Sequence, residues 1–161
     1  MATDFLLEIE GVKGESTDEK HKGKIEVDSF SWGCTNQATG GRGTGSGAGK
    51  ADFQDFHFSK QCDSASHDLI KSCATGKHFA KAVLTARKAG TEQQEFLVVT
   101  MEDVFVSSFS SSGAAGGGSI PLEQVSLNYT KIKYEYKPQD KKGALSGQMV
   151  AGYDRAANKA I

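Results

Sequence analysis

The sequence lacks the features that would direct it to a membrane, a signal-peptide export route or nucleic acid. No apolar run among its 161 residues approaches the roughly 18 residues that a membrane-spanning helix needs. The first residues, MATDFLLEIEG, include an early acid and no basic segment, so they do not resemble a signal peptide. The formal net charge is −1, which does not indicate nucleic acid or an anionic membrane surface as partner. We therefore expect no membrane insertion and no nucleic-acid binding.

Cysteine is scarce, and its positions do not suggest pairs. The three cysteines, Cys34, Cys62 and Cys73, are an odd number without a close pair, which argues against a disulfide framework and favours a reducing compartment. Cys62 and Cys73 each have a histidine five residues later, but no C-x-x-C or H-x₃₋₅-H pair accompanies them. We expect neither disulfides nor a bound metal.

Glycine is concentrated in residues 40–50, GGRGTGSGAGK, which resemble a phosphate-binding loop at first sight. A P-loop needs a glycine where Thr44 stands and a hydroxyl where Ala51 stands, so both ends of that motif fail. A dinucleotide-binding pattern fits inside the segment, but the residues that follow alternate like a strand, whereas the pattern requires a helix there. We interpret the segment as a loop with another purpose, and we expect no cofactor.

Most of the chain has the period-two alternation of β-strands. Phe56 and Phe58 fall on one face of their segment, and Asp55, His57 and Ser59 fall on the other. Over residues 29–35, the aromatic residues and Cys34 share one face that we expect in the core. The opposite face is small and polar and consists of Ser29, Ser31, Gly33 and Thr35.

Two long strands are expected on either side of a serine- and glycine-rich segment, residues 110–119, which predicts a flexible hairpin loop. The strand before it, from about residue 95, is apolar almost throughout, as expected for burial on much of both faces. In the strand after it, the apolar phase changes between Tyr129 and Ile132. This change predicts a β-bulge near Thr130 and Lys131.

One helix is expected at about residues 64–75. Ser64 or Ser66 can cap its start, Asp68 lies in the first turn, and Gly76 is placed to end it. Its apolar face would consist of Leu69, Ile70 and Cys73. Together with about eight strands, this helix predicts a mainly β single domain over residues 1–161, whose edges would be removed by closure into a barrel.

No catalytic group can be assembled from the sequence. The four histidines are scattered, and the combination of Asp55, His57 and Ser59 on one strand places neighbouring members about 6.6 Å apart. That spacing exceeds the hydrogen-bonding reach that a nucleophile and its base require. We expect no enzymatic activity.

Several segments together resemble the haemolysin-coregulated protein (Hcp) family, the tube proteins of the bacterial type VI secretion system. They occur in the family's order and spacing between about residues 2 and 139: VKGES, SFSWG, GAGK, DFHFSKQCD, SCATGKHFAKAVLTARKAG, VFVSSFSSSG and PLEQVSLNYTKIKYEYKPQ. The resemblance weakens beyond residue 139, although GYDRAANK falls where the family has its last strand.

The resemblance implies two antiparallel sheets that close into a β-barrel with one short flanking helix, similar to phage tail tube proteins. It also implies hexameric rings that stack into a tube, which a contractile sheath drives out of the cell behind a tip spike. Small effector proteins would travel in the lumen. The subunit would reside in the bacterial cytoplasm before firing and then be secreted, without a signal peptide, outside the cell or into a target cell. We expect no fused toxin domain.

The resemblance also gives roles to residues. The ring-stacking loop that it implies comprises Gly40, Gly41, Arg42, Gly43, Thr44, Gly45, Ser46, Gly47, Ala48, Gly49 and Lys50. We expect Arg42 and Lys50 to pair with acids such as Glu15 or Asp18 of the next ring. The small polar face at residues 29–35 becomes a candidate lumen wall. Two alternatives stay open: a monomeric β-barrel that carries a small ligand, and a nucleotide-dependent enzyme that uses the glycine-rich loop.

Overall fold

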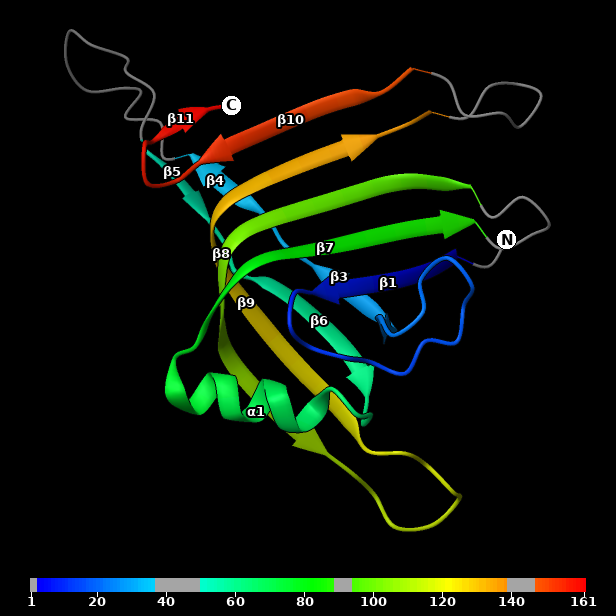
Figure 1. The fold of residues 1–161 in the computed structure, drawn as a ribbon. Helices are drawn as coiled ribbons and strands as arrows, with labels where there is room; N and C mark the ends of the chain where they lie inside the picture. The colour runs from blue at the N-terminus through cyan, green and yellow to red at the C-terminus, as the bar shows by residue number, and fades with distance from the viewer. Residues whose placement is uncertain (1–2, 37–49, 89–93, 139–146) are drawn as a thin grey trace, which may run out of the picture.

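The computed structural model, which describes residues 3–36, 50–88, 94–138 and 147–161, contains one helix, α1 (Ser66–Thr75), and eleven strands (Figure 1). The strands are β1 (Thr3–Ile9), β2 (Ile25–Val27), β3 (Ser29–Ser31), β4 (Cys34–Asn36), β5 (Ala51–Phe53), β6 (Phe56–Gln61), β7 (His78–Lys88), β8 (Glu95–Ser112), β9 (Leu122–Tyr136), β10 (Met149–Asp154) and β11 (Lys159–Ala160). The turn between β8 and β9 is residues 113–121, so the serines before it belong to the β8 ladder.

The main sheet is antiparallel, with the strand order β11-β10-β9-β8-β7-β1-β2. β9 joins two layers, because its first half pairs with β6 and its second half pairs with β10. β3 pairs with β6, and β4 and β5 form a separate two-stranded sheet. The closed barrel that the sequence predicted is not found in the described part of the chain. The pairing path has two ends, and β2 and β11, with three and two residues, are short.

β7, β8 and β9 bend together between the two layers, as Figure 1 shows. Met101 pairs with Ile132 before the bend, and Val104 pairs with Tyr129 after it. All four side chains are buried, so the alternation of buried and exposed residues shifts by one position at the bend. The phase change predicted in β9 is thus confirmed, but the bulge is wrongly placed. The β8–β9 register is continuous there and shifts instead between Val106 and Ser108.

Asp103 produces the phase change on β8, because its φ of 52° turns the backbone into the left-handed region within the strand. Its carboxylate is held from both sides: Thr130 Oγ1 donates to Oδ2 at 2.7 Å, and His78 Nδ1 lies 2.9 Å from Oδ1. The hydrogen bond from Thr130, followed by that from His78, lowers the pKa of Asp103. A residue on each neighbouring strand therefore supports the bend.

The core lies between the layers. Phe56 and Phe58 are buried and His57 is exposed, which confirms the alternation in β6. Phe30 and Trp32 are half-buried and pack against the core. The expected burial of both faces of β8 is wrong, because only one face is buried at a time: Leu97, Val99 and Met101 before the bend, and Val104 and Val106 after it. The second layer covers one face of the sheet, so the other phase stays partly exposed.

Helix α1 ends as predicted but begins differently. Gly76 adopts the left-handed conformation, with a φ of 69°, and closes the helix. The N-cap is Ala65, so neither predicted serine caps the helix. The Asp63 carboxylate accepts a hydrogen bond from the Ala65 amide at 2.9 Å instead. Ser64 donates to the Lys13 carbonyl, while the Ser66 hydroxyl is engaged by buried charged groups.

The apolar face predicted for α1 is only partly correct. Leu69 is buried and Cys73 is half-buried, but Ile70 is 49% exposed. Helix α1 packs against β8, and Ile70 lies off the face that makes this contact.

Candidate functional surfaces

β3, β6, the first half of β9 and the second half of β8 form one of the two layers. A polar surface covers the face of this layer that points away from the core. Two rows of paired residues cross these four strands. The first row is Ser29, Ser59, Gln124 and Ser110, and the second is Ser31, His57, Ser126 and Ser108. The row between them, which includes Phe30 and Phe58, points to the core. We call the eight polar residues the serine surface.

The serine surface is internally hydrogen-bonded. Ser29 Oγ and Ser59 Oγ lie 2.5 Å apart, and Ser108 and Ser126 share a short hydroxyl contact. A shallow cleft lies along it, lined mainly by these side chains. Seven of its eight members offer hydroxyl, imidazole and amide groups, and none of the eight is a carboxylate or an ammonium; Ser126 is buried, and its hydroxyl bonds to Ser107 and Ser108. The surface can exchange hydrogen bonds with a passing partner without a large apolar area to hold it.

The sequence identified only part of this surface. Ser29 and Ser31 lie on it, but Gly33 follows the end of β3, and Thr35 belongs to β4 in the two-stranded sheet. The continuous face predicted over residues 29–35 is therefore broken after Ser31. The residues that were missed on β8 are the polar members of SSFSSS, whose alternation around the half-buried Phe109 was the available signal.

Asp55, just before β6, and His57 and Ser59 on β6 do not form a catalytic unit. The Asp55 carboxylate accepts hydrogen bonds from Ser107 Oγ at 2.7 Å and Asn128 Nδ2 at 2.9 Å. His57 is exposed within the serine surface, and Ser59 contacts Ser29. Asp55 and Ser59 thus bond to residues on other strands, and no hydrogen bond links the three side chains within the described residues, as the strand spacing predicted.

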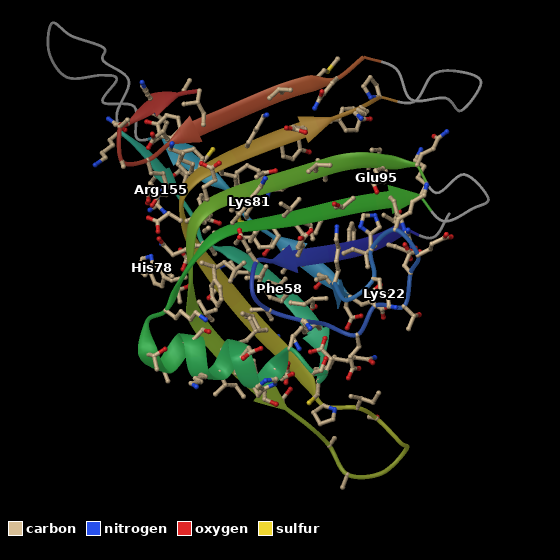
Figure 2. All side chains as sticks on the ribbon, viewed as in Figure 1. Lys22, Phe58, His78, Lys81, Glu95 and Arg155 are labelled. Atoms are coloured by element: carbon tan, nitrogen blue, oxygen red, sulfur yellow. The ribbon has the colours of Figure 1, made fainter. Side chains whose placement is uncertain are left out.

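β4 and β5 hold the two ends of the predicted stacking loop. Asn36 pairs with Ala51, and Lys50 is exposed; residues 40–49 lie outside the described part of the chain. In Figure 2 this pair of strands lies at the same end of the molecule as Arg155, and Lys22 and Glu95 lie at the opposite end. A loop that leaves beyond β4 and β5 therefore starts far from the loop that contains Lys22.

The two acids expected to receive the stacking loop differ in their surroundings. Asp18 Oδ2 accepts a hydrogen bond from Arg87 Nη2 at 2.7 Å, and this bond lowers the pKa of Asp18 to about 2. Glu15 is exposed and has no ion pair with the described residues. Asp18 is therefore occupied within its own chain, whereas Glu15 is available to a partner.

Metal chemistry, disulfides and membrane-spanning helices find no support in the described residues. No group of three or more His, Cys, Asp or Glu side chains is arranged there to hold a metal ion. The three cysteines are free thiols. No helix within the described ranges is long and apolar enough to cross a bilayer.

Comparison with known proteins gives a consistent result over the length of the chain. A family model described as "Type VI secretion system effector, Hcp" matches residues 6–136. Protein hcp1 of Pseudomonas aeruginosa is 41% identical over 148 residues, 91% of each chain. A solved structure of a type six secretion system protein has a TM-score of 0.94 at 34% identity and covers 99% of this chain and 100% of its own. Hcp1 from Salmonella typhimurium has a TM-score of 0.83 at 39% identity, with 100% of both chains covered.

Proposed function

Because this chain belongs to the Hcp family of the type VI secretion system, we propose that it forms hexameric rings that stack into a secretion tube. The family consists of structural, secreted tube proteins, so the chain is not an enzyme. The similarity to Hcp structures over the whole chain is the observation that carries the proposal. The edge of β10 at residues 149–151 supports it, because a closed ring would cover an edge that has no second partner among the described strands.

The serine surface is proposed as part of the lumen wall. Ser29 and Ser31 face outward on it beside small polar neighbours from three further strands. A wall that must release small effector proteins benefits from weak, exchangeable hydrogen bonds and from the absence of a large apolar patch. Gly33 and Thr35 would extend this wall toward the stacking loop.

Ring stacking is proposed to be head-to-tail and to use residues 40–50. β4 and β5, which flank the loop in sequence, lie at the end of the molecule that carries Arg155, and the loop with Lys22 lies at the other end (Figure 2). Arg42 and Lys50 of one ring would therefore face the acidic loop of the next. Since Asp18 is already paired with Arg87, we assign the main inter-ring ion pair to Glu15.

The cellular route follows from the same proposal. Rings would assemble in the bacterial cytoplasm, within the contractile sheath and behind the tip spike, and would leave the cell with small effector proteins inside. Export by the machine would require no signal peptide.

Light scattering on a sizing column tests the ring. Six copies of 17.1 kDa should give a discrete species of about 103 kDa. A mass of 17.1 kDa at every concentration would overturn the ring and favour a monomeric carrier of a small ligand. A rise in the melting temperature with ATP or NAD would instead favour nucleotide binding.

A further inference from the structure

The core-facing side of the main sheet becomes progressively uncovered from β8 to β10. In one row of paired residues, Leu97, Tyr136 and Met149 are 8%, 39% and 63% exposed. In the next row, Val99 is 0% and Tyr134 36% exposed. Residues of one row lie on the same face of the sheet. The gradient therefore shows that the second layer of the chain ends beneath β9.

Contacts between aromatic rings show how far the second layer covers the main sheet. The Trp32 ring lies 6.0 Å from the Tyr134 ring, and the Phe53 ring lies 4.9 Å from the Tyr153 ring. Within the described residues, no such ring contact reaches Tyr136, and Met149 beside it is mostly exposed. An apolar face that continues the core is thus left open at one end of the sheet.

The adjoining strand edge is open as well. Among the described strands, residues 149–151 of β10 pair with β9 on one side only, because β11 begins its pairing at Tyr153 and the Ile161 amide bonds to Gly152. Natural edge strands are protected by charges, proline or bulges, and residues 149–151 carry no charge and no proline. Val150, on the other face of β10, is 52% exposed. An edge that is apolar on both faces suits another polypeptide strand or surface.

Opposite charges at the two ends of the sheet favour a second copy of the chain as the partner of the open β10 edge. Lys137 follows β9 beside the open face and has no ion pair with the described residues. At the far end of the strand order, β2 pairs with β1 on one side, and the Asp28 amide just after it donates to the Ser59 carbonyl of β6. There Glu26 and Asp28 are exposed and likewise have no ion pair within the described chain. One end of the sheet therefore offers an unpaired cation, and the other offers unpaired acids.

We infer that the β10 surface, consisting of Tyr134, Tyr136, Met149 and Val150, docks the β2 end of a second copy, where Glu26 and Asp28 meet Lys137. The inference rests on the proposed ring and specifies which surfaces of neighbouring subunits meet. Two different surfaces make a head-to-tail contact, which closes into a ring when the rotation between copies allows it.

Val150→Lys tests the β10 surface, because a charge at an open edge opposes pairing with another chain. The mass by light scattering should fall from about 103 kDa to 17.1 kDa, with a far-UV spectrum unchanged from the wild type. Met149→Glu should have the same effect. Ile70→Lys is the matched control, since this apolar residue is 49% exposed on α1, and its variant should keep the ring mass. A folded Val150→Lys variant at the ring mass would overturn the assignment.

Mixing two variants tests the partner surface. Val150→Lys leaves the β2 end intact, and a Glu26→Arg, Asp28→Arg variant leaves the β10 surface intact. Each should be monomeric alone, and their mixture should form a pair of about 34 kDa through the one contact that remains, twice 17.1 kDa. A mixture without that pair would show that the β2 end is not the partner. A wild-type chain at 17.1 kDa would overturn the ring itself, together with this assignment.

Discussion

Lys60 Nζ lies 2.6 Å from Glu123 Oε1, and both side chains are buried, with exposed fractions of 0% and 3%. The same ammonium contacts Asp63 Oδ1 at 2.7 Å and Ser66 Oγ at 3.0 Å. These contacts connect β6 and β9 to the start of α1. A buried charge is tolerated only when its partners replace the water that it has lost, so the four residues depend on one another.

Replacing Lys60 by Met should lower the free energy of unfolding by about 3 to 5 kcal/mol, because Glu123 would be left buried without its partner. Urea unfolding, followed by circular dichroism at a fixed protein concentration, measures the change. Lys81→Met, at an exposed lysine of β7, is the control and should change little. The double variant Lys60→Met, Glu123→Leu should recover most of the loss. Equal stability of the Lys60 and Lys81 variants would contradict the prediction.

Asp18 should make stability depend on acidity. Arg87 holds the folded pKa of Asp18 near 2, below its ordinary value of 3.8, so the ion pair contributes fully above about pH 4. The contribution is lost as the pH falls from there toward 2. The melting temperature of Asp18→Asn should therefore fall less steeply over this range than that of the wild type. Glu19→Gln, at the exposed neighbour, should follow the wild type. Parallel curves for Asp18→Asn and the wild type would refute the role of the pair.

Asp103→Val should destabilise the chain by about 1 to 3 kcal/mol, because a β-branched residue is disfavoured at positive φ. The substitution also removes the hydrogen bonds with Thr130 and His78. Chemical denaturation measures the loss. Glu102→Val is the matched control, since this neighbouring residue is also exposed and has no positive φ. A similar effect of the two substitutions would exclude a special role for the Asp103 backbone.

Arg42→Glu should weaken the stacking of rings and leave each ring intact. The substitution places like charges opposite each other where we propose a contact with Glu15 of the next ring. Electron microscopy would count tubes, and light scattering would verify the ring mass. Adding Glu15→Arg should restore stacking by reversing both signs. Unchanged tube formation by Arg42→Glu alone would rule the contact out.

Ser31→Lys should impair delivery of a passenger effector without changing the ring mass. A lysine at this position adds length and charge to the serine surface, where we propose that the passenger slides and is held by hydrogen bonds. Secreted effector is measured by immunoblot, relative to the secreted tube protein. Ser119→Lys, at an exposed serine in the β8–β9 turn, is the control. Normal effector secretion by Ser31→Lys would remove this surface from the lumen wall.

Local signals in the sequence were sufficient for several elements. Gly76 ends α1 because glycine accepts positive φ at no cost, and Phe56 and Phe58 alternate because one face of β6 is buried. The start of α1 could not be predicted equally well. Asp63 caps the first turn, and its carboxylate also pairs with Lys60, which pairs in turn with Glu123 on β9. The residues around the start of the helix do not reveal that Glu123 lies nearby.

The candidate surfaces show the same limit. Ser29 and Ser31 are visible in the alternation of their own segment, whereas Gln124 and Ser126 join them only because β9 pairs with β6. Such a pairing between segments distant in sequence is set by the whole fold. The stacking loop stays a prediction, since residues 40–49 lie outside the described part of the chain.

The passage of β7, β8 and β9 through the bend has a mechanical consequence. These strands run from one layer into the other without interruption, and the ladder between β8 and β9 continues on both sides of Asp103. Force applied to one layer is therefore carried to the other along peptide bonds and strand-to-strand hydrogen bonds. In the tube that we propose, thrust forward by a contracting sheath, such a subunit would resist shear between its layers, and the bore would keep its width under load.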